Sequence, residues 1–169
     1  MLFRSDEDSL SSGTPYRRAL ETPICHGSRT FILGTRDFAN SAYYDCWVRE
    51  QGITTIPVEW FDLRPAFEIA RDVLGRVHLS SDAIFLSIDI DAAELPGSSA
   101  AAPGTLSSRE MIALVRALSA SPLLIGCDLS ELSPPWDLSG MTAKLAARLF
   151  VEVLAQRRHS APSEVEGPT

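Results

Sequence analysis

Short apolar runs alternate with helical segments along most of the chain, and this alternation limits the possible folds more than any other feature. Runs of β-branched and aliphatic residues predict strands at 30–33, 53–56, 83–90 and 123–127. Helical patterns occupy 15–20, 41–51, 65–74, 107–118 and 139–157. Strands that alternate with helices form βαβ units, so we predict an α/β fold with three layers, αβα, around a mainly parallel sheet.

The composition indicates the size and the surroundings of this fold. The chain has 169 residues, 45% hydrophobic and 22% charged, which is close to the globular average. We expect a single domain over 1–158 and a disordered tail over 159–169. A formal net charge of −7 argues against nucleic-acid binding, and no apolar run is long enough to span a membrane. Three cysteines without metal-ligand spacing, and no signal-peptide pattern, predict a cytoplasmic protein.

Acidic residues stand at the ends of the third and fourth predicted strands. Asp89 and Asp91 are two residues apart, so strand alternation would place both side chains on the same side. Asp128 and Glu131 directly follow the fourth strand. Because ligands bind at the carboxyl ends of parallel strands, these residues predict an acidic pocket for a divalent cation or a cationic amidinium group. Turn and capping roles are the alternative interpretation of the same residues.

The two acidic segments together resemble the ureohydrolase family of arginases, agmatinases and formimidoylglutamases. The family motif Ser-x-Asp-x-Asp matches residues 87–91. Its Asp-x-x-Glu segment, followed by Pro, Asp and a Gly-x-Thr-Ala helix, matches residues 128–147, and residues 12–18 are similar to a third family segment. The resemblance extends from about Ser11 to Ala155 and implies a ureohydrolase-like fold that lacks the family's amino-terminal strands.

The resemblance also implies a chemistry. In the family, two manganese ions hold a hydroxide that attacks the amidine carbon of a linear substrate, and Asp89 and Asp91 match its metal ligands. Glu131 matches the catalytic residue that holds the cationic nitrogen group, and Asp128 matches a supporting residue. Arg36, in the loop after the first strand, is a candidate for binding a substrate carboxylate. The implied function is manganese-dependent hydrolysis of C–N bonds in linear amidines, with formimidoylglutamate favoured over agmatine and guanidinobutyrate.

Four further metal ligands of the family have no match in this sequence. The family supplies them from Gly-Gly-Asp-His and Asp-Ala-His-x-Asp segments, and His26, His78 and His159 stand in neither context. Two carboxylates alone bind Mn²⁺ weakly, so we expect weak or partial metal binding and either a carboxyl-terminal part of an enzyme or a degenerate relative. A truncated parallel sheet has an open edge, so we also expect a homo-oligomer or a requirement for the missing amino-terminal half.

Two other functions stay open on the sequence. A non-catalytic domain with the same fold, acting through assembly, agrees with the missing ligands. An Asp-x-Asp pair also occurs in phosphoryl- and glycosyl-transfer enzymes, but no Gly-rich phosphate loop follows a predicted strand here.

Overall fold

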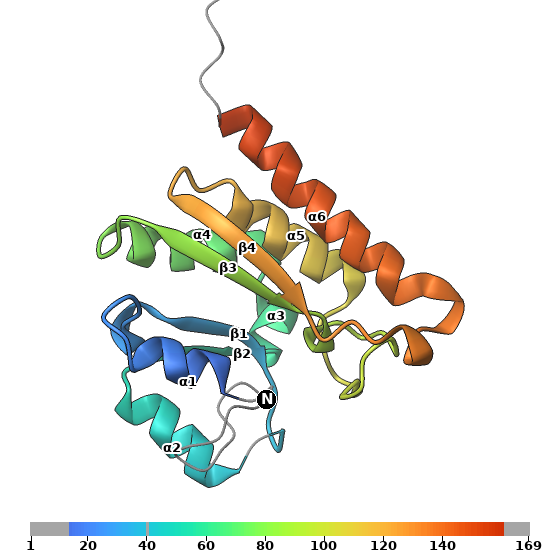
Figure 1. The fold of residues 1–169 in the computed structure, drawn as a ribbon, viewed down its shortest axis with the longest axis horizontal. Coiled ribbons are helices and arrows are strands. Elements are labelled where there is room, and N and C mark those ends of the chain that lie inside the picture. Colours follow the sequence, from blue (N-terminus) through green and yellow to red (C-terminus); the bar gives the residue numbers. More distant parts are fainter. Residues whose placement is uncertain (1–13, 40, 161–169) are drawn as a thin grey trace, which may run out of the picture. The chain divides into compact units, whose positions relative to one another are not determined.

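The computed structural model describes residues 14–39 and 41–160, with side chains up to residue 157 (Figure 1). The described residues form two compact units, which divide between Leu63 and Arg64. Each unit is described by itself. The first contains α1 (Pro15–Leu20), η1 (Gly27–Arg29), β1 (Phe31–Thr35), α2 (Ala42–Glu50), β2 (Thr54–Pro57) and α3 (Glu59–Leu63). The second contains α4 (Ala66–His78), β3 (Ile84–Asp89), η2 (Ile90–Ala92), α5 (Ser108–Ser119), β4 (Leu124–Ser130), η3 (Pro134–Trp136), η4 (Leu138–Gly140) and α6 (Met141–Ser160).

The first unit is one βαβ element. Strands β1 and β2 pair in parallel with Phe31 opposite Thr54, and α2 forms the crossover between them. A small core of Val48 and Ile53, with Trp47 packed against it, holds the helix to its neighbours. The parallel pairing is the arrangement that the alternation of strands and helices predicts.

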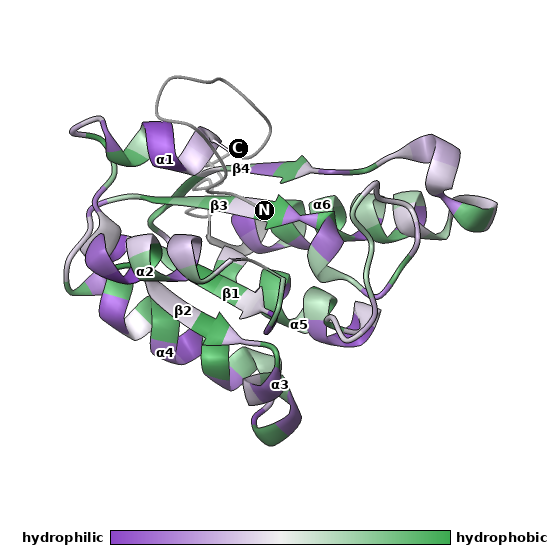
Figure 2. Cartoon of the chain, turned by 90° about the horizontal axis from the view of Figure 1, so that it is seen from below, coloured by the Kyte–Doolittle hydropathy of each residue, from purple (hydrophilic) through white to green (hydrophobic). Residues whose placement is uncertain are grey.

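The second unit repeats this arrangement on a larger scale. Strands β3 and β4 pair in parallel, α5 forms the crossover, and α5 also packs between α4 and α6 (Figure 1). Hydrophobic and hydrophilic residues alternate along α4 (Figure 2), because one face is buried against the rest of the unit. The buried residues of that face recur every three or four positions and are Ala66, Ile69, Ala70, Val73 and Val77.

Most predicted elements are present, but several boundaries differ. Helix α4 continues through Gly75, where the sequence predicted its end, because its apolar face extends to the buried Val77. Strand β4 runs on to Ser130 because its last residues pair with β3. The short helix α3 was not predicted at all. Residues 161–169, most of the predicted tail, lie outside the described residues.

Within the described residues, no helix has the length and apolarity that crossing a membrane requires.

An ion cluster joins α5 to α6 inside the second unit. Arg116 of α5 donates two hydrogen bonds to the carboxylate of Glu152, with N–O distances of 2.7 and 2.9 Å, and Arg148 of α6 lies 2.6 Å from the same carboxylate. Glu152 is only 5% exposed. The hydrogen bonds from Arg116 lower the pKa of Glu152 to about 2, with Arg148 adding to this effect against the opposing effect of burial. The cluster therefore stabilises the helix pair only while Glu152 is ionised.

Replacing Glu152 by Gln should lower the free energy of unfolding at pH 7 by about 1–3 kcal/mol, because two charge-assisted hydrogen-bond partners are lost. The folded-state pKa of Glu152 lies below the unfolded value of 4.5. The loss of unfolding free energy in Glu152→Gln should therefore be complete above pH 4.5 and should disappear as the pH falls towards 2. Urea unfolding at a series of pH values measures it, with the exposed Glu94→Gln as control. An unchanged difference at low pH would contradict the assignment.

Candidate functional site

The first half of the site is the end of β3. Ile88 and Ile90 are 4% and 0% exposed and anchor this segment in the core, while Asp89 and Asp91 between and after them are half-buried. The strand ends at Asp89, and Asp91 lies in the one-turn helix η2. The backbone N–H of Asp91 donates to Oδ1 of Asp89 at 2.9 Å. A turn, rather than the predicted strand alternation, therefore sets the position of Asp91 relative to Asp89.

The second half is the end of β4. Asp128 lies opposite Ser87, and the Ser87 hydroxyl donates to Oδ1 of Asp128 at 2.6 Å. Asp89 lies opposite Ser130, the residue before Glu131. The parallel register thus brings Asp89, Asp128 and Glu131 to the same end of the strand pair, as the sequence predicted.

The backbone of Glu131 is in the left-handed region, with φ of 67°. A residue with a side chain adopts this conformation at a cost of roughly 1–3 kcal/mol unless its surroundings impose it. Here the neighbours on both sides are held, because Ser130 pairs with β3 and Leu132 forms an antiparallel bridge with Ser98. Strain of this kind is concentrated at functional sites, which makes Glu131 a candidate on geometry as well as on spacing.

The other predicted residues are placed as follows. Arg36 follows β1 in the first unit, so its relation to the carboxylates of the second unit stays a prediction. Its Nη1 atom is buried and makes no hydrogen bond with any described residue. His26 is exposed, and His78 makes a 2.8 Å hydrogen bond to Ser121. Ser12, Gly13 and the side chain of His159 lie outside the described residues.

The residues that the structure describes do not complete a metal site. Within residues 14–39 and 41–157, no three His, Cys, Asp or Glu side chains come together in a way that could hold an ion. The carboxylates of Asp89 and Asp91 are donors of the kind that Mn²⁺ accepts, but an ion of this type usually takes about six ligands. Two carboxylate donors would therefore supply only part of the ligand set of such an ion.

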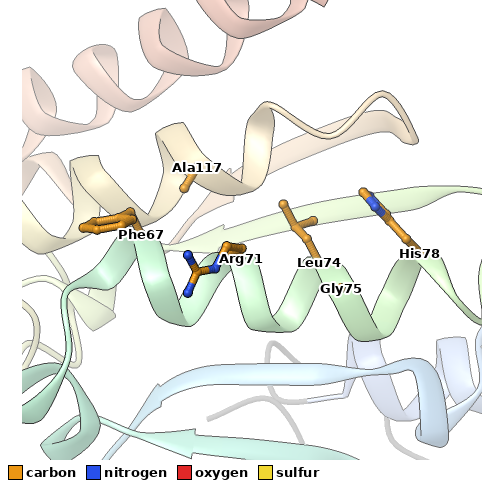
Figure 3. Close-up of a pocket in the computed structure, with 6 residues that line it drawn as sticks. All are labelled: Phe67, Arg71, Leu74, Gly75, His78 and Ala117. Carbon is orange, nitrogen blue, oxygen red and sulfur yellow. The ribbon is translucent and has the colours of Figure 1, made fainter.

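A hollow of about 390 Å³ lies elsewhere in the second unit, on the surface of α4 (Figure 3). Phe67, Arg71, Leu74 and His78 of α4 line it, together with Ala117 of α5. The hollow has two basic side chains and no carboxylate in its lining, so it does not suit a cationic amidine. The carboxyl ends of β3 and β4 remain the candidate site.

Comparison with known proteins identifies the family of this chain. The model of the arginase family matches residues 3–155. The chain belongs to the arginase family. It is 28% identical to the formimidoylglutamase of Bacillus subtilis over 155 residues, which cover 89% of this chain and 49% of that protein. It is 31% identical to the guanidinobutyrase of Pseudomonas aeruginosa, covering 87% of this chain and 46% of the relative.

Solved structures give the same result for the fold. The crystal structure of B. subtilis formimidoylglutamase superposes with a TM-score of 0.86 over 92% of this chain and 50% of that one, at 28% identity. A structure of Trypanosoma cruzi formiminoglutamase with Mn²⁺ superposes with a TM-score of 0.78 at 23% identity. The predicted ureohydrolase-like αβα fold is therefore confirmed. The chain spans about half the length of these arginase-family relatives.

Two groups at this site were missed by the sequence interpretation. Ser87 opens the Ser-x-Asp-x-Asp motif, and its bond to Asp128 could have been inferred had the strand register been known. Gly97, in the loop after Asp91, donates its backbone N–H to Thr142 at the start of α6. Their signal was the Pro-Gly pair at 96–97 and the Gly-x-Thr-Ala motif, whose proximity only the structure shows.

Glu131→Gly should raise the free energy of unfolding by about 0.5 kcal/mol, because the strain of the left-handed backbone exceeds the entropic cost of a glycine. Ser130→Gly, one residue earlier in the paired strand, should lower it by about 0.5–1 kcal/mol. Chemical denaturation of the two variants measures the contrast. Equal destabilisation by both would show that Glu131 carries no strain.

Proposed function

We propose that this chain carries the carboxyl-terminal side of the active site of a manganese-dependent hydrolase that cleaves a C–N bond in a linear amidine or guanidine. The observation that supports the proposal most is the register that places Asp89 opposite Ser130, and hence next to Glu131. A pair of candidate metal ligands and a candidate cation-binding carboxylate then share one end of a strand pair, within an arginase-family fold.

The role of Glu131 follows from the chemistry of the substrate group. An amidinium or guanidinium group is a planar cation with N–H donors on one edge, and a carboxylate can accept two parallel hydrogen bonds from it. Glu131 is half-buried, and its side chain makes no hydrogen bond or ion pair with the residues that the structure describes. We assign it to hold the cationic end of the substrate, while Arg36 is the proposed partner for a substrate carboxylate.

The substrates that we propose for this chain are a narrower class than those of the whole family. Formimidoylglutamate combines carboxylates with a cationic formimidoyl group, which is the group that Glu131 is proposed to hold. Relatives of this chain are named formimidoylglutamase and guanidinobutyrase, and both names describe an acid that carries an amidine or guanidine group. A substrate with a carboxylate is therefore proposed ahead of agmatine, which has none, although a further relative is named agmatinase.

Asp89 and Asp91 are the proposed manganese ligands of this chain. A structure with Mn²⁺ is known for the T. cruzi relative. Bound manganese activates a water molecule for attack on the amidine carbon. Because two carboxylates do not complete the site, the other ligands must come from outside the described residues.

A manganese titration of the purified chain tests the metal assignment. We expect weak binding, with a dissociation constant of about 10⁻⁴ M or higher, and its loss in Asp89→Asn. The matched control is Asp82→Asn, an exposed aspartate before β3. Calorimetry of the three proteins measures it.

The outcomes of this titration are distinct. Binding that survives Asp89→Asn contradicts the ligand assignment. Tight binding of two ions per chain contradicts the incomplete site, and it also excludes a purely non-catalytic domain.

Binding of formimidoylglutamate in the presence of millimolar Mn²⁺ tests the role of Glu131. Glu131→Gln should weaken binding roughly tenfold or more, because the hydrogen bonds to a charged carboxylate are lost. Glu94→Gln, on the loop after β3, should leave it unchanged, and NMR titration of the ligand measures both. An equal loss in the two variants would point to general charge rather than to a specific contact.

A second candidate function is a non-catalytic arginase-family domain that acts through assembly. The observation that favours it is the lack of three clustered metal donors among the described residues. No heat from Mn²⁺ at any concentration up to millimolar would favour this function over the hydrolase.

A further inference from the structure

The loop that follows Asp91 and the loop that follows Glu131 are joined at their centres. The backbone N–H of Ser133 donates to the carbonyl of Gly97 at 2.8 Å, and Ser98 forms an antiparallel bridge with Leu132. The first loop is also closed at its base, where Ala93 pairs in parallel with Leu106. The loop after Asp91 and the loop after Glu131 therefore contact each other directly.

A buried hydrogen bond fixes this junction to the start of α6. The backbone N–H of Gly97 donates to Oγ1 of Thr142 at 2.9 Å, and Thr142 is 0% exposed. A Cβ atom on Gly97 would overlap Cβ and Oγ1 of Thr142 and would crowd Asp137. Only glycine allows the loop backbone to approach the threonine so closely.

Asp137 fixes the position of Thr142. Its two carboxylate oxygens accept from the backbone N–H groups of Thr142 and Ala143 at 2.8 and 2.9 Å. Burial raises the pKa of Asp137, but these hydrogen bonds and the nearby Lys144 outweigh it and keep that pKa below its usual value. A charged aspartate at a helix start is favourable, so the position of Thr142 is well defined.

The geometry points to Gly97 and Thr142 as a clamp that holds Glu131 in its left-handed conformation beside Asp89, ready for the cationic group of a substrate. Glu131 lies between Ser130, which is paired with β3, and Leu132 and Ser133, which are held by Ser98 and Gly97. If the loop that contains Gly97 is released, Leu132 and Ser133 are no longer held. The backbone of Glu131 can then leave the left-handed region. Thr142 is thus a positioning residue that acts through Gly97 and never touches the ligand; the ligand role of Glu131 rests on the proposed function.

Three threonine variants test the clamp. Thr142→Val keeps the shape and removes the hydroxyl that accepts from Gly97, while Thr142→Ser keeps the hydroxyl. Thr105→Val is the matched control, since Thr105 is also buried, at 9% exposure, and lies in the loop that contains Gly97. Among the described residues its hydroxyl bonds to the carbonyl of Ala102 and not to Gly97. The backbone ¹³C chemical shifts of Glu131 report its left-handed conformation, and amide exchange of Ser133 reports the junction.

We expect Thr142→Val to shift the Glu131 resonances towards ordinary values, to speed exchange of the Ser133 amide roughly three- to tenfold, and to weaken formimidoylglutamate binding by a similar factor. Thr142→Ser and Thr105→Val should resemble the parent chain. Glu131 resonances that stay unchanged in Thr142→Val overturn the clamp, as does an equal effect of Thr142→Ser. A parent chain that binds no amidine overturns the proposed function instead, and the Glu131 resonances then still decide the clamp.

Discussion

The parallel pairing of β3 with β4 is the interaction on which the candidate site depends. The two strands come from segments about forty residues apart in sequence, and their backbone hydrogen bonds set which residues face each other. With Asp89 opposite Ser130 and Ser87 opposite Asp128, carboxylates from both strands gather at one end. A shift of one residue would turn every side chain of a strand to its other face and separate Asp89 from Asp128.

Gathering negative charges in this way is unfavourable unless something offsets their repulsion. Part of the offset is visible in the structure, where Ser87 donates to Asp128 and the Asp91 backbone donates to Asp89. The left-handed backbone of Glu131 persists because the paired residues on both sides of it impose that conformation.

The candidate site of this chain is incomplete as a metal site within the described residues. The described residues contribute two candidate metal ligands and one candidate cation-binding group, yet they do not bring three metal donors together. Within its own unit, each described strand pair is parallel, β1 with β2 and β3 with β4. The chain spans about half the length of its relatives.

The sequence by itself determined most of the local structure and which acidic residues are candidates for the site. Apolar periodicity predicted the strands and most helices, Ser107 and Glu110 predicted the cap of α5, and the acids at strand ends predicted where ligands bind. Tertiary contacts decided the rest. Helix α4 passes Gly75 because Val77 is buried, and β4 extends to Ser130 because β3 offers hydrogen-bond partners there. The contact of Gly97 with Thr142 joins residues 45 positions apart, and no local pattern encodes such a distance.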